Sequence, residues 1–240
     1  MPKLNGILIG REQVADATWA FRLDPKATLP YKPGQTIDLT IPHPMHQDEL
    51  GNKRTFSLAA APEHGKILIA TRVRGSAFKR SLLDGPLGMA VDVEGPFGSF
   101  TLPSKPSRVV LLAGGIGITP FRAMAEDAIL RRLDHSILLV HSNRTPEETP
   151  FLGELRDWSA GNPGFRYLPT MTRVEQSRMP WAGERRRVGP ELLADILPSD
   201  RSAPIYYVAG PERFVKGAAE SLKAVGVDED RVRTEEFPGY

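Results

Sequence analysis

The segment LLAGGIGITPFRAM, residues 111–124, joins an apolar run to a glycine-rich stretch and the start of a helical pattern. Its glycines are Gly114, Gly115 and Gly117. Glycine lets a ligand approach the backbone closely, and free N–H groups at a helix start attract anions. Thr119 and Pro120 are typical of an N-cap and a first helical residue, which predicts a helix over residues 121–133. The segment predicts a phosphate-binding turn; a tight strand-to-helix turn that binds nothing is the alternative.

This turn departs from the usual dinucleotide fingerprint. That fingerprint has a glycine where Pro120 stands and an acidic ribose ligand near the end of the next strand. The next strand, LLVHSNR at residues 138–144, offers only Arg144 at its end. We therefore expect a phosphate site of a different kind from the plain Rossmann motif.

The elements that must position this turn follow from the chain's two different halves. With 240 residues, 40% hydrophobic and 25% charged, the chain is long enough for two globular domains. Short β-rich segments between Pro, Gly and Asp turns predict an antiparallel β-barrel over residues 1–104, with one helix near residues 77–83. Strands then alternate with helices, which predicts an α/β domain with a five-stranded parallel sheet over residues 105–240.

Several classes of function are not expected. The chain has no cysteine, which excludes disulfides, thiolate nucleophiles and Cys-ligated zinc or iron–sulfur centres within it. His43 and His46 lie in a proline-flanked loop without a third ligand, so no metal site is expected. A net charge of +2 gives no reason to expect nucleic acid. No apolar run approaches about 18 residues and no secretory leader is apparent, so we expect no membrane association and a cytoplasmic protein.

Four motifs resemble those of the ferredoxin–NADP reductase family and occur in its order. RTFS at residues 54–57 resembles the Arg-x-Tyr-Ser flavin motif, and GSAFKRSL at residues 75–82 resembles the flavin-phosphate segment. GGIGITP at residues 114–120 is similar to the pyridine-nucleotide loop, and AGP at residues 209–211 to Cys-Gly-Pro. Together they span nearly the whole chain. The resemblance implies a flavin-binding barrel followed by an NAD(P)-binding domain.

In the barrel, the resemblance implies binding of FAD, with FMN as the less favoured alternative. Phe56 would lie against the flavin ring, Ser57 would hydrogen-bond its N5 region as a catalytic residue, and Arg54 would pair with the pyrophosphate. Lys79 stands where the family often has a hydroxyl, and would neutralise phosphate as a point charge. The other residues expected at the flavin are Thr55, Thr71, Val73, Ala77 and Phe78.

In the α/β half, the resemblance assigns the glycine turn and the AGP motif to NADPH or NADH. The AGP residues are Ala209, Gly210 and Pro211. Ala209 replaces the family's cysteine, which approaches the nicotinamide. Arg144, Arg173 and the basic run at residues 185–187 favour NADPH, because guanidinium groups bind a 2′-phosphate well.

The C-terminal TEEFPGY adds two expected site residues. Glu236 matches an acidic residue that the family places near the nicotinamide, and we expect it to be catalytic. Tyr240 would cover the flavin face opposite Phe56, with a solvated tail as the alternative.

The resemblance implies an NAD(P)H-dependent flavoprotein reductase that passes electrons through FAD to a separate one-electron carrier, a ferredoxin or flavodoxin. The lack of cysteine favours a separate carrier. One alternative is a reductase component of an oxygenase, or a reductase of free flavin, ferric complexes or quinones. Another is a flavin-binding regulatory subunit without nicotinamide activity, which Ala209 leaves open.

Overall fold

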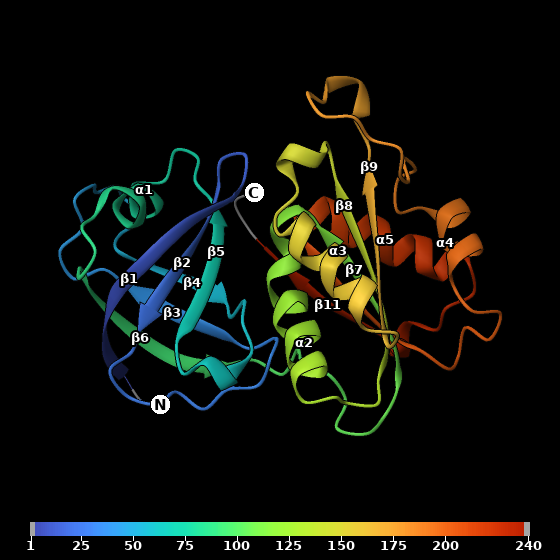
Figure 1. Cartoon of the computed structure of the whole chain (residues 1–240), viewed down its shortest axis with the longest axis horizontal. Helices are drawn as coiled ribbons and strands as arrows, with labels where there is room; N and C mark the ends of the chain where they lie inside the picture. The colour runs from blue at the N-terminus through green and yellow to red at the C-terminus, as the bar shows by residue number, and fades with distance from the viewer. Residues whose placement is uncertain (1–2, 238–240) are drawn as a thin grey trace.

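The computed structural model describes residues 3–237, and its first half is a six-stranded antiparallel sheet. The strands pair in the order β4-β3-β6-β1-β2-β5. They are β1 (Lys3–Ala15), β2 (Thr18–Asp24), β3 (Thr36–Thr40), β4 (Lys53–Ser57), β5 (Ile67–Arg72) and β6 (Ala90–Phe97). Alternate residues of β3 are buried because side chains on a strand point to opposite faces. The sheet curls into the half-barrel on the left of Figure 1. Helix α1 (Ala77–Asp84) packs Phe78 and Leu82 into its core.

The second half is a five-stranded parallel sheet in the order β11-β10-β7-β8-β9, on the right of Figure 1. Its strands are β7 (Arg108–Gly114), β8 (Ser136–Asn143), β9 (Phe165–Met171), β10 (Ile205–Gly210) and β11 (Val232–Glu236). Its helices are α2 (Ile118–Leu130), α3 (Leu152–Gly161), α4 (Pro190–Ile196) and α5 (Glu212–Ala224). Helices α2 and α3 cover one face and α4 and α5 the other. The sequence RVVLLAG of β7 is almost continuously apolar because both faces are buried.

The two-domain fold class predicted from the sequence is confirmed, but the start of α2 differs from the prediction. A 3-10 turn at Gly115–Gly117 runs directly into the helix, which therefore begins at Ile118 with Gly117 as its N-cap. Thr119 is already helical, and its hydroxyl donates to the Ile116 carbonyl at 3.2 Å. The N-cap role expected of Thr119 was wrong because the turn itself has helix-like geometry. The remaining 3-10 turns are Pro62–His64, Pro146–Glu148, Val174–Gln176 and Glu229–Arg231.

A buried arginine of α2 joins the two halves. The Arg122 guanidinium donates to the Ala59 carbonyl of the barrel half at 2.6 Å and to Glu154 at 2.6 Å. It also lies over the rings of Phe151 and Trp158. A buried guanidinium is stable when its donors are satisfied and a carboxylate is paired with it. Arg122 therefore anchors α2 against the barrel.

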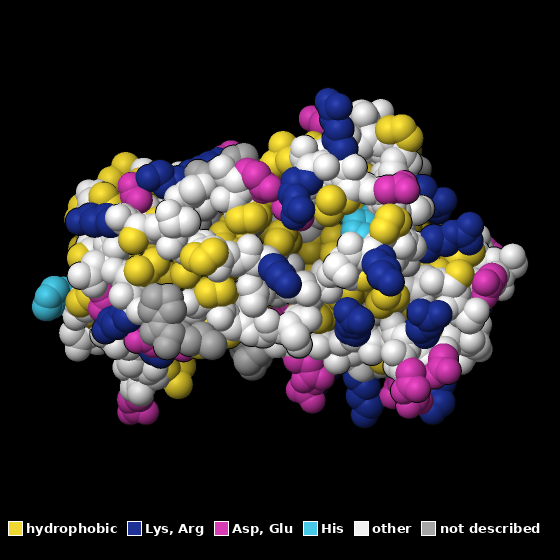
Figure 2. All heavy atoms as spheres, turned by 90° about the horizontal axis from the view of Figure 1, so that it is seen from below, with side chains coloured by type: hydrophobic (Ala, Val, Ile, Leu, Met, Phe, Trp, Pro, Cys, Tyr) yellow, Lys and Arg dark blue, Asp and Glu magenta, His cyan; other side chains and the backbone are white. Residues whose placement is uncertain are grey.

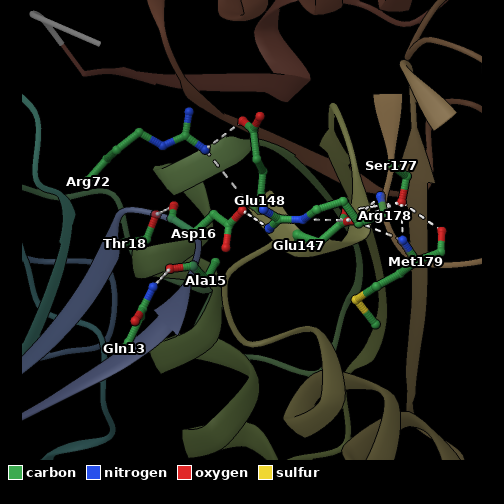
Figure 3. A network of polar contacts seen from close by, with 10 residues as sticks. All are labelled: Gln13, Ala15, Asp16, Thr18, Arg72, Glu147, Glu148, Ser177, Arg178 and Met179. Atoms are coloured by element: carbon green, nitrogen blue, oxygen red, sulfur yellow. Dashed lines mark hydrogen bonds and ion pairs between the residues drawn. The ribbon is translucent and has the colours of Figure 1, made fainter. Parts of the chain in front are cut away.

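A second network crosses the same interface (Figure 3). Asp16, in the turn after β1, donates its amide to the Glu147 carbonyl at 2.8 Å and pairs through its carboxylate with Arg178. Arg72, at the end of β5, lies 3.2 Å from the carboxylate of Glu148. These contacts fix the edge of the barrel against the loops that follow β8 and β9.

Two surface properties bear on the expected partners. Among residues 3–237, no helix is long and apolar enough to cross a membrane. On the face seen in Figure 2, basic side chains predominate across the middle of the α/β half, and most of the acidic ones lie along its lower edge.

Candidate functional site

The glycine turn lies where the direction of the parallel sheet changes. Strands β7 and β10 are neighbours, yet the chain continues from β7 to β8 on one side and from β10 to β11 on the other. At such a point the connections diverge and leave a crevice at the carboxyl ends of the strands. Gly114 ends β7 and Gly210 ends β10, so the two glycine-containing motifs meet at this crevice.

The three glycines of the turn meet three different requirements. Gly115 has φ +55°, a left-handed conformation that favours glycine. A Cβ on Gly114 would lie 2.5 Å from the ring of Phe214. A Cβ on Gly117 would collide with the carbonyl of Ala209 on β10. Two of the glycines therefore permit close packing within the protein, and only the conformation at Gly115 concerns the turn itself.

A cavity of about 530 Å³, called the barrel cavity below, lies between the barrel and the second half. Of the residues predicted from the sequence, it is lined by Arg54, Thr55, Phe56, Ser57, Lys79, Thr119 and Glu236. Residues that sequence reasoning missed also line it: Thr36, Asp38, Leu50, Lys53, Ala70, Ser76, Ile116, Glu235 and Phe237. Thr71 and Phe78 are buried and Val73 half-buried; with Ala77 they do not line the cavity. The structure thus brings the RTFS motif and the C-terminal strand to one cavity.

Phe56 is mainly a core residue. Only 7% of it is exposed, and its ring centroid lies 5.9 Å from that of Phe78. It lines the barrel cavity from within the hydrophobic core of the half-barrel. Packing against Phe78 fixes the position of the ring at the cavity wall.

An acidic side chain that sequence reasoning missed lies beside Arg54. The Arg54 guanidinium donates to the carbonyls of Leu50 and Lys53 at 2.8 and 2.6 Å and lies 3.5 Å from Asp48. The other carboxylate oxygen of Asp48 accepts the Ala77 amide at 3.0 Å, at the start of α1. No local pattern reveals the contact between Asp48 and Ala77, because these two residues are 29 positions apart.

The two glutamates of the C-terminal strand have different environments. Glu235 and Glu236 are adjacent in β11, opposite Ala209 and Gly210, and both line the barrel cavity. Glu236, the residue expected from the sequence, is exposed. Glu235 has a buried carboxylate oxygen without a hydrogen-bond partner in the described chain, and burial raises the pKa of Glu235 to about 7. Glu235 is therefore the better placed of the two to hold a proton near neutral pH. Tyr240 lies outside the described residues.

A second cavity of about 680 Å³, called the strand-end cavity below, opens at the carboxyl ends of β7, β8 and β10. Of the predicted residues, it is lined by Lys79, Gly114, Gly115, Arg144 and Pro211. The residues that sequence reasoning missed are Arg72, Arg74, Ile116, Ser142, Asn143, Glu148, Thr172, Arg213 and Phe214. Five of the lining side chains are cationic and one, Glu148, is acidic. This excess of positive charge suits a phosphorylated ligand.

Several residues expected at the nucleotide lie outside both cavities. They are Gly117, Pro120, Arg173, Ala209 and Gly210. Ala209 is fully buried in the core against α2. In the basic run 185–187, Arg186 pairs with Glu184 and Asp195. The central guanidinium of the run is therefore held by neighbouring carboxylates, and none of its three arginines lines the strand-end cavity.

The barrel cavity and the strand-end cavity share two lining residues, Ile116 and Lys79. Ile116 belongs to the glycine turn and Lys79 to α1, so one comes from each half of the protein. Two ligands bound in the two cavities would therefore approach each other at the domain interface.

Comparisons with known proteins show which sequences this chain is similar to. Residues 111–220 match the family described as oxidoreductase NAD-binding domain. The chain is 30% identical over 224 residues to ferredoxin–NADP reductase B of Sorangium cellulosum, covering 90% of this chain and 88% of that protein. It is 26% identical to the glycine betaine monooxygenase reductase subunit of Chromohalobacter salexigens, covering 92% of this chain but 60% of the longer relative.

Solved structures show the same fold. The cytochrome P450 reductase of Amycolatopsis superposes with a TM-score of 0.82 at 24% identity, covering 98% of this chain and 70% of that one. A ferredoxin NADP+ reductase of Neisseria gonorrhoeae, solved with bound FAD and NADP, has a TM-score of 0.80 at 20% identity and covers 98% and 99%. The family is shown by the sequence match: at 30% identity over nearly the whole Sorangium protein, the chain belongs to the ferredoxin–NADP reductase family.

Proposed function

We propose that the protein is an NAD(P)H-dependent flavoprotein reductase that binds FAD in the barrel cavity and NAD(P)H in the strand-end cavity. The observation that carries the proposal is the wall that these cavities share at Ile116 and Lys79. Hydride transfer needs two reactants held in contact and aligned, more than it needs a protein nucleophile. Membership of the ferredoxin–NADP reductase family supports this reading.

The chain's own residues would hold and orient the cofactors. Arg54 and Lys79 would neutralise the flavin phosphates, and Ser57 and Phe56 would position the ring from β4. FAD, when bound, supplies the conversion between two-electron and one-electron transfer. Glu235 would hold a proton at its buried carboxylate oxygen beside the same cavity.

The charges of the strand-end cavity favour NADPH over NADH. Arg74, Arg144 and Arg213 line it and have no carboxylate partner within residues 3–237. A 2′-phosphate offers a dianion that planar guanidinium groups bind through two hydrogen bonds. We therefore place the 2′-phosphate among these arginines.

We propose a separate electron carrier, a ferredoxin or flavodoxin, as the acceptor. The chain has no cysteine to ligate an iron–sulfur cluster. A reductase component of an oxygenase is the second candidate, because the relatives include subunits so named and the chain spans about 60% of their length. We also propose a cytoplasmic location, because the proposed reductant is a cytoplasmic metabolite.

An anaerobic titration tests the proposal. The protein loaded with FAD should be yellow, and NADPH should bleach the flavin absorbance at a lower concentration than NADH. Reduced ferredoxin or flavodoxin should then accumulate faster than reduced free flavin, ferric complexes or quinones. Protein that takes up no FAD would overturn the proposal. Protein that binds FAD but is bleached by neither nucleotide would identify a flavin-binding subunit instead.

A further inference from the structure

A fully buried histidine lies directly beneath the glycine turn. His141 belongs to β8 and is 0% exposed. Its Nε2 lies 2.8 Å from the carbonyl oxygen of Gly115, and its Nδ1 lies 3.1 Å from the hydroxyl of Tyr167 on β9. Both ring nitrogens therefore have partners, and one of these partners is Gly115, which lines the strand-end cavity.

The chemistry of the partners determines where the protons are. A carbonyl oxygen only accepts, so Nε2 must carry the proton and donate to Gly115. The unprotonated Nδ1 then accepts from the Tyr167 hydroxyl. Burial lowers the pKa of His141 to about 4, so the ring is neutral at physiological pH. In the chain of hydrogen bonds from Tyr167 through His141 to Gly115, the imidazole is therefore in one tautomer. Each group donates to the next one toward Gly115.

The hydrogen bond from His141 to the Gly115 carbonyl helps to fix the orientation of the peptide group between Gly115 and Ile116. The same Gly115 carbonyl also accepts the amide of Ile118, so two donors hold it toward the protein interior. In a planar trans peptide the N–H points opposite to the C=O. The N–H of Ile116 therefore points away from His141, and both residues of this peptide, Gly115 and Ile116, line the strand-end cavity.

We propose that His141 is a positioning residue that aims the Ile116 N–H at the phosphates of the bound nicotinamide nucleotide. The proposal rests on the proposed function, because it assigns the nucleotide to the strand-end cavity. His141 touches no ligand itself; it adds a second donor, beside the Ile118 amide, that holds the Gly115 carbonyl and so favours one orientation of this peptide. An amide fixed in advance toward an anion binds it without paying the ordering entropy at that moment.

The test measures NADP+ binding to the FAD-loaded protein by calorimetry. His141→Phe keeps an aromatic ring but removes the donor, and should raise the Kd for NADP+ about tenfold, the equivalent of one hydrogen bond of about 1.4 kcal/mol. His141→Gln retains an N–H donor and should restore most of the affinity. With NADPH as substrate, KM should rise more than kcat falls, and FAD affinity should not change.

A matched control is the histidine that directly precedes β8, at the opposite end of that strand from the glycine turn. His135 is 8% exposed, and its Nδ1 lies 3.2 Å from the amide of Ser107, remote from the strand-end cavity. His135→Phe should lower the free energy of unfolding without changing the Kd for NADP+. An equal rise of Kd in both phenylalanine variants, or none in His141→Phe, would overturn the proposal.

Two measurements separate this inference from the proposed function. Nitrogen-15 NMR of the imidazole, recorded without nucleotide, should show Nε2 protonated and Nδ1 free; the reverse tautomer would overturn this chain of hydrogen bonds. Tyr167→Phe should weaken NADP+ binding less than His141→Phe, because only the tautomer preference is lost. If the parent protein binds no NADP+ while the tautomer is as stated, and His141→Phe speeds exchange of the Ile118 amide that donates to the Gly115 carbonyl, the proposed function fails but the hold of His141 on the turn stands.

Discussion

The carboxylate of Asp48 lies 3.0 Å from the amide nitrogen of Ala77, so an acidic side chain occupies the N-terminus of α1. Its other oxygen lies 3.5 Å from the Arg54 guanidinium. Arg54 and Lys79, which lies in the first turn of α1, are the groups that we expect to hold the flavin phosphates. Asp48 is therefore an internal anion at the place where we expect a phosphate, and the two would repel each other.

We predict that Asp48→Asn binds FAD more tightly than the parent, because asparagine keeps an acceptor for Ala77 but removes the charge. Riboflavin, which has no phosphate, should bind both proteins equally. Flavin fluorescence quenching gives both Kd values. Arg54→Ala should have the opposite effect and weaken the binding of FAD by about 1.5 to 3 kcal/mol. The control for a general change of charge is Glu49→Gln, at the exposed residue next to Asp48 in the chain. An equal gain of FAD affinity in Glu49→Gln would contradict the prediction for Asp48→Asn.

Glu235→Gln should change how stability depends on pH. Burial raises the pKa of Glu235 to about 7 in the folded protein, above its ordinary value of 4.5. The folded state thus binds more protons than the unfolded state between these values, and stability falls as pH rises through this window. Above pH 7 the ionised carboxylate of Glu235 lowers the free energy of unfolding by at most about 3.4 kcal/mol. Glutamine cannot ionise, so the variant should gain stability over the parent at pH 8 but not at pH 4.

Urea unfolding at the two pH values measures this difference. Glu236→Gln, its exposed neighbour in β11, is the matched control and should differ little from the parent at either pH. A variant of Glu235 whose stability relative to the parent is independent of pH would show that the carboxyl is solvated in the folded protein.

Gly117→Val should both destabilise the protein and abolish NADP+ binding. The added side chain would collide with the Ala209 carbonyl and lie 2.6 Å from the Cα of Gly210, both at the end of β10. Overpacking of this kind costs about 1 to 3 kcal/mol and displaces the turn. Thermal unfolding and calorimetry provide the two readouts. Gly217→Ala on α5 meets no atom within 4 Å and should be neutral or stabilising; normal binding in Gly117→Val would contradict the prediction.

Arg144→Ala and Arg213→Ala should each raise the KM for NADPH severalfold and leave that for NADH nearly unchanged, because NADH lacks the phosphate they contact. Both side chains line the strand-end cavity. Arg173→Ala should have the smaller effect, since Arg173 does not line the cavity and only its amide contacts the carbonyl of Arg144, at 2.8 Å. Steady-state kinetics with both nucleotides distinguish these outcomes. Equal weakening of NADPH and NADH would show that the arginines recognise a group common to both.

Local sequence determined the classes of element and the position of the glycine turn. Alternating residues such as TIDLT predict half-buried strands, and the continuous apolar run of RVVLLAG predicts a strand covered on both faces, because each pattern reports the burial of its own segment. The four residues of the RTFS motif line the barrel cavity together because they are consecutive in one strand. These predictions depend on residues close together in the chain.

Contacts between distant residues were decided only by the tertiary structure. The place of Asp48 at α1 depends on how a loop folds back over a helix that begins 29 positions later. The burial of Glu235 in preference to Glu236 depends on how β11 pairs with β10. The link from His141 to Gly115 requires two neighbouring parallel strands, β7 and β8. No local pattern encodes such contacts, because they arise from the register and packing of elements whose own sequences are compatible with several partners.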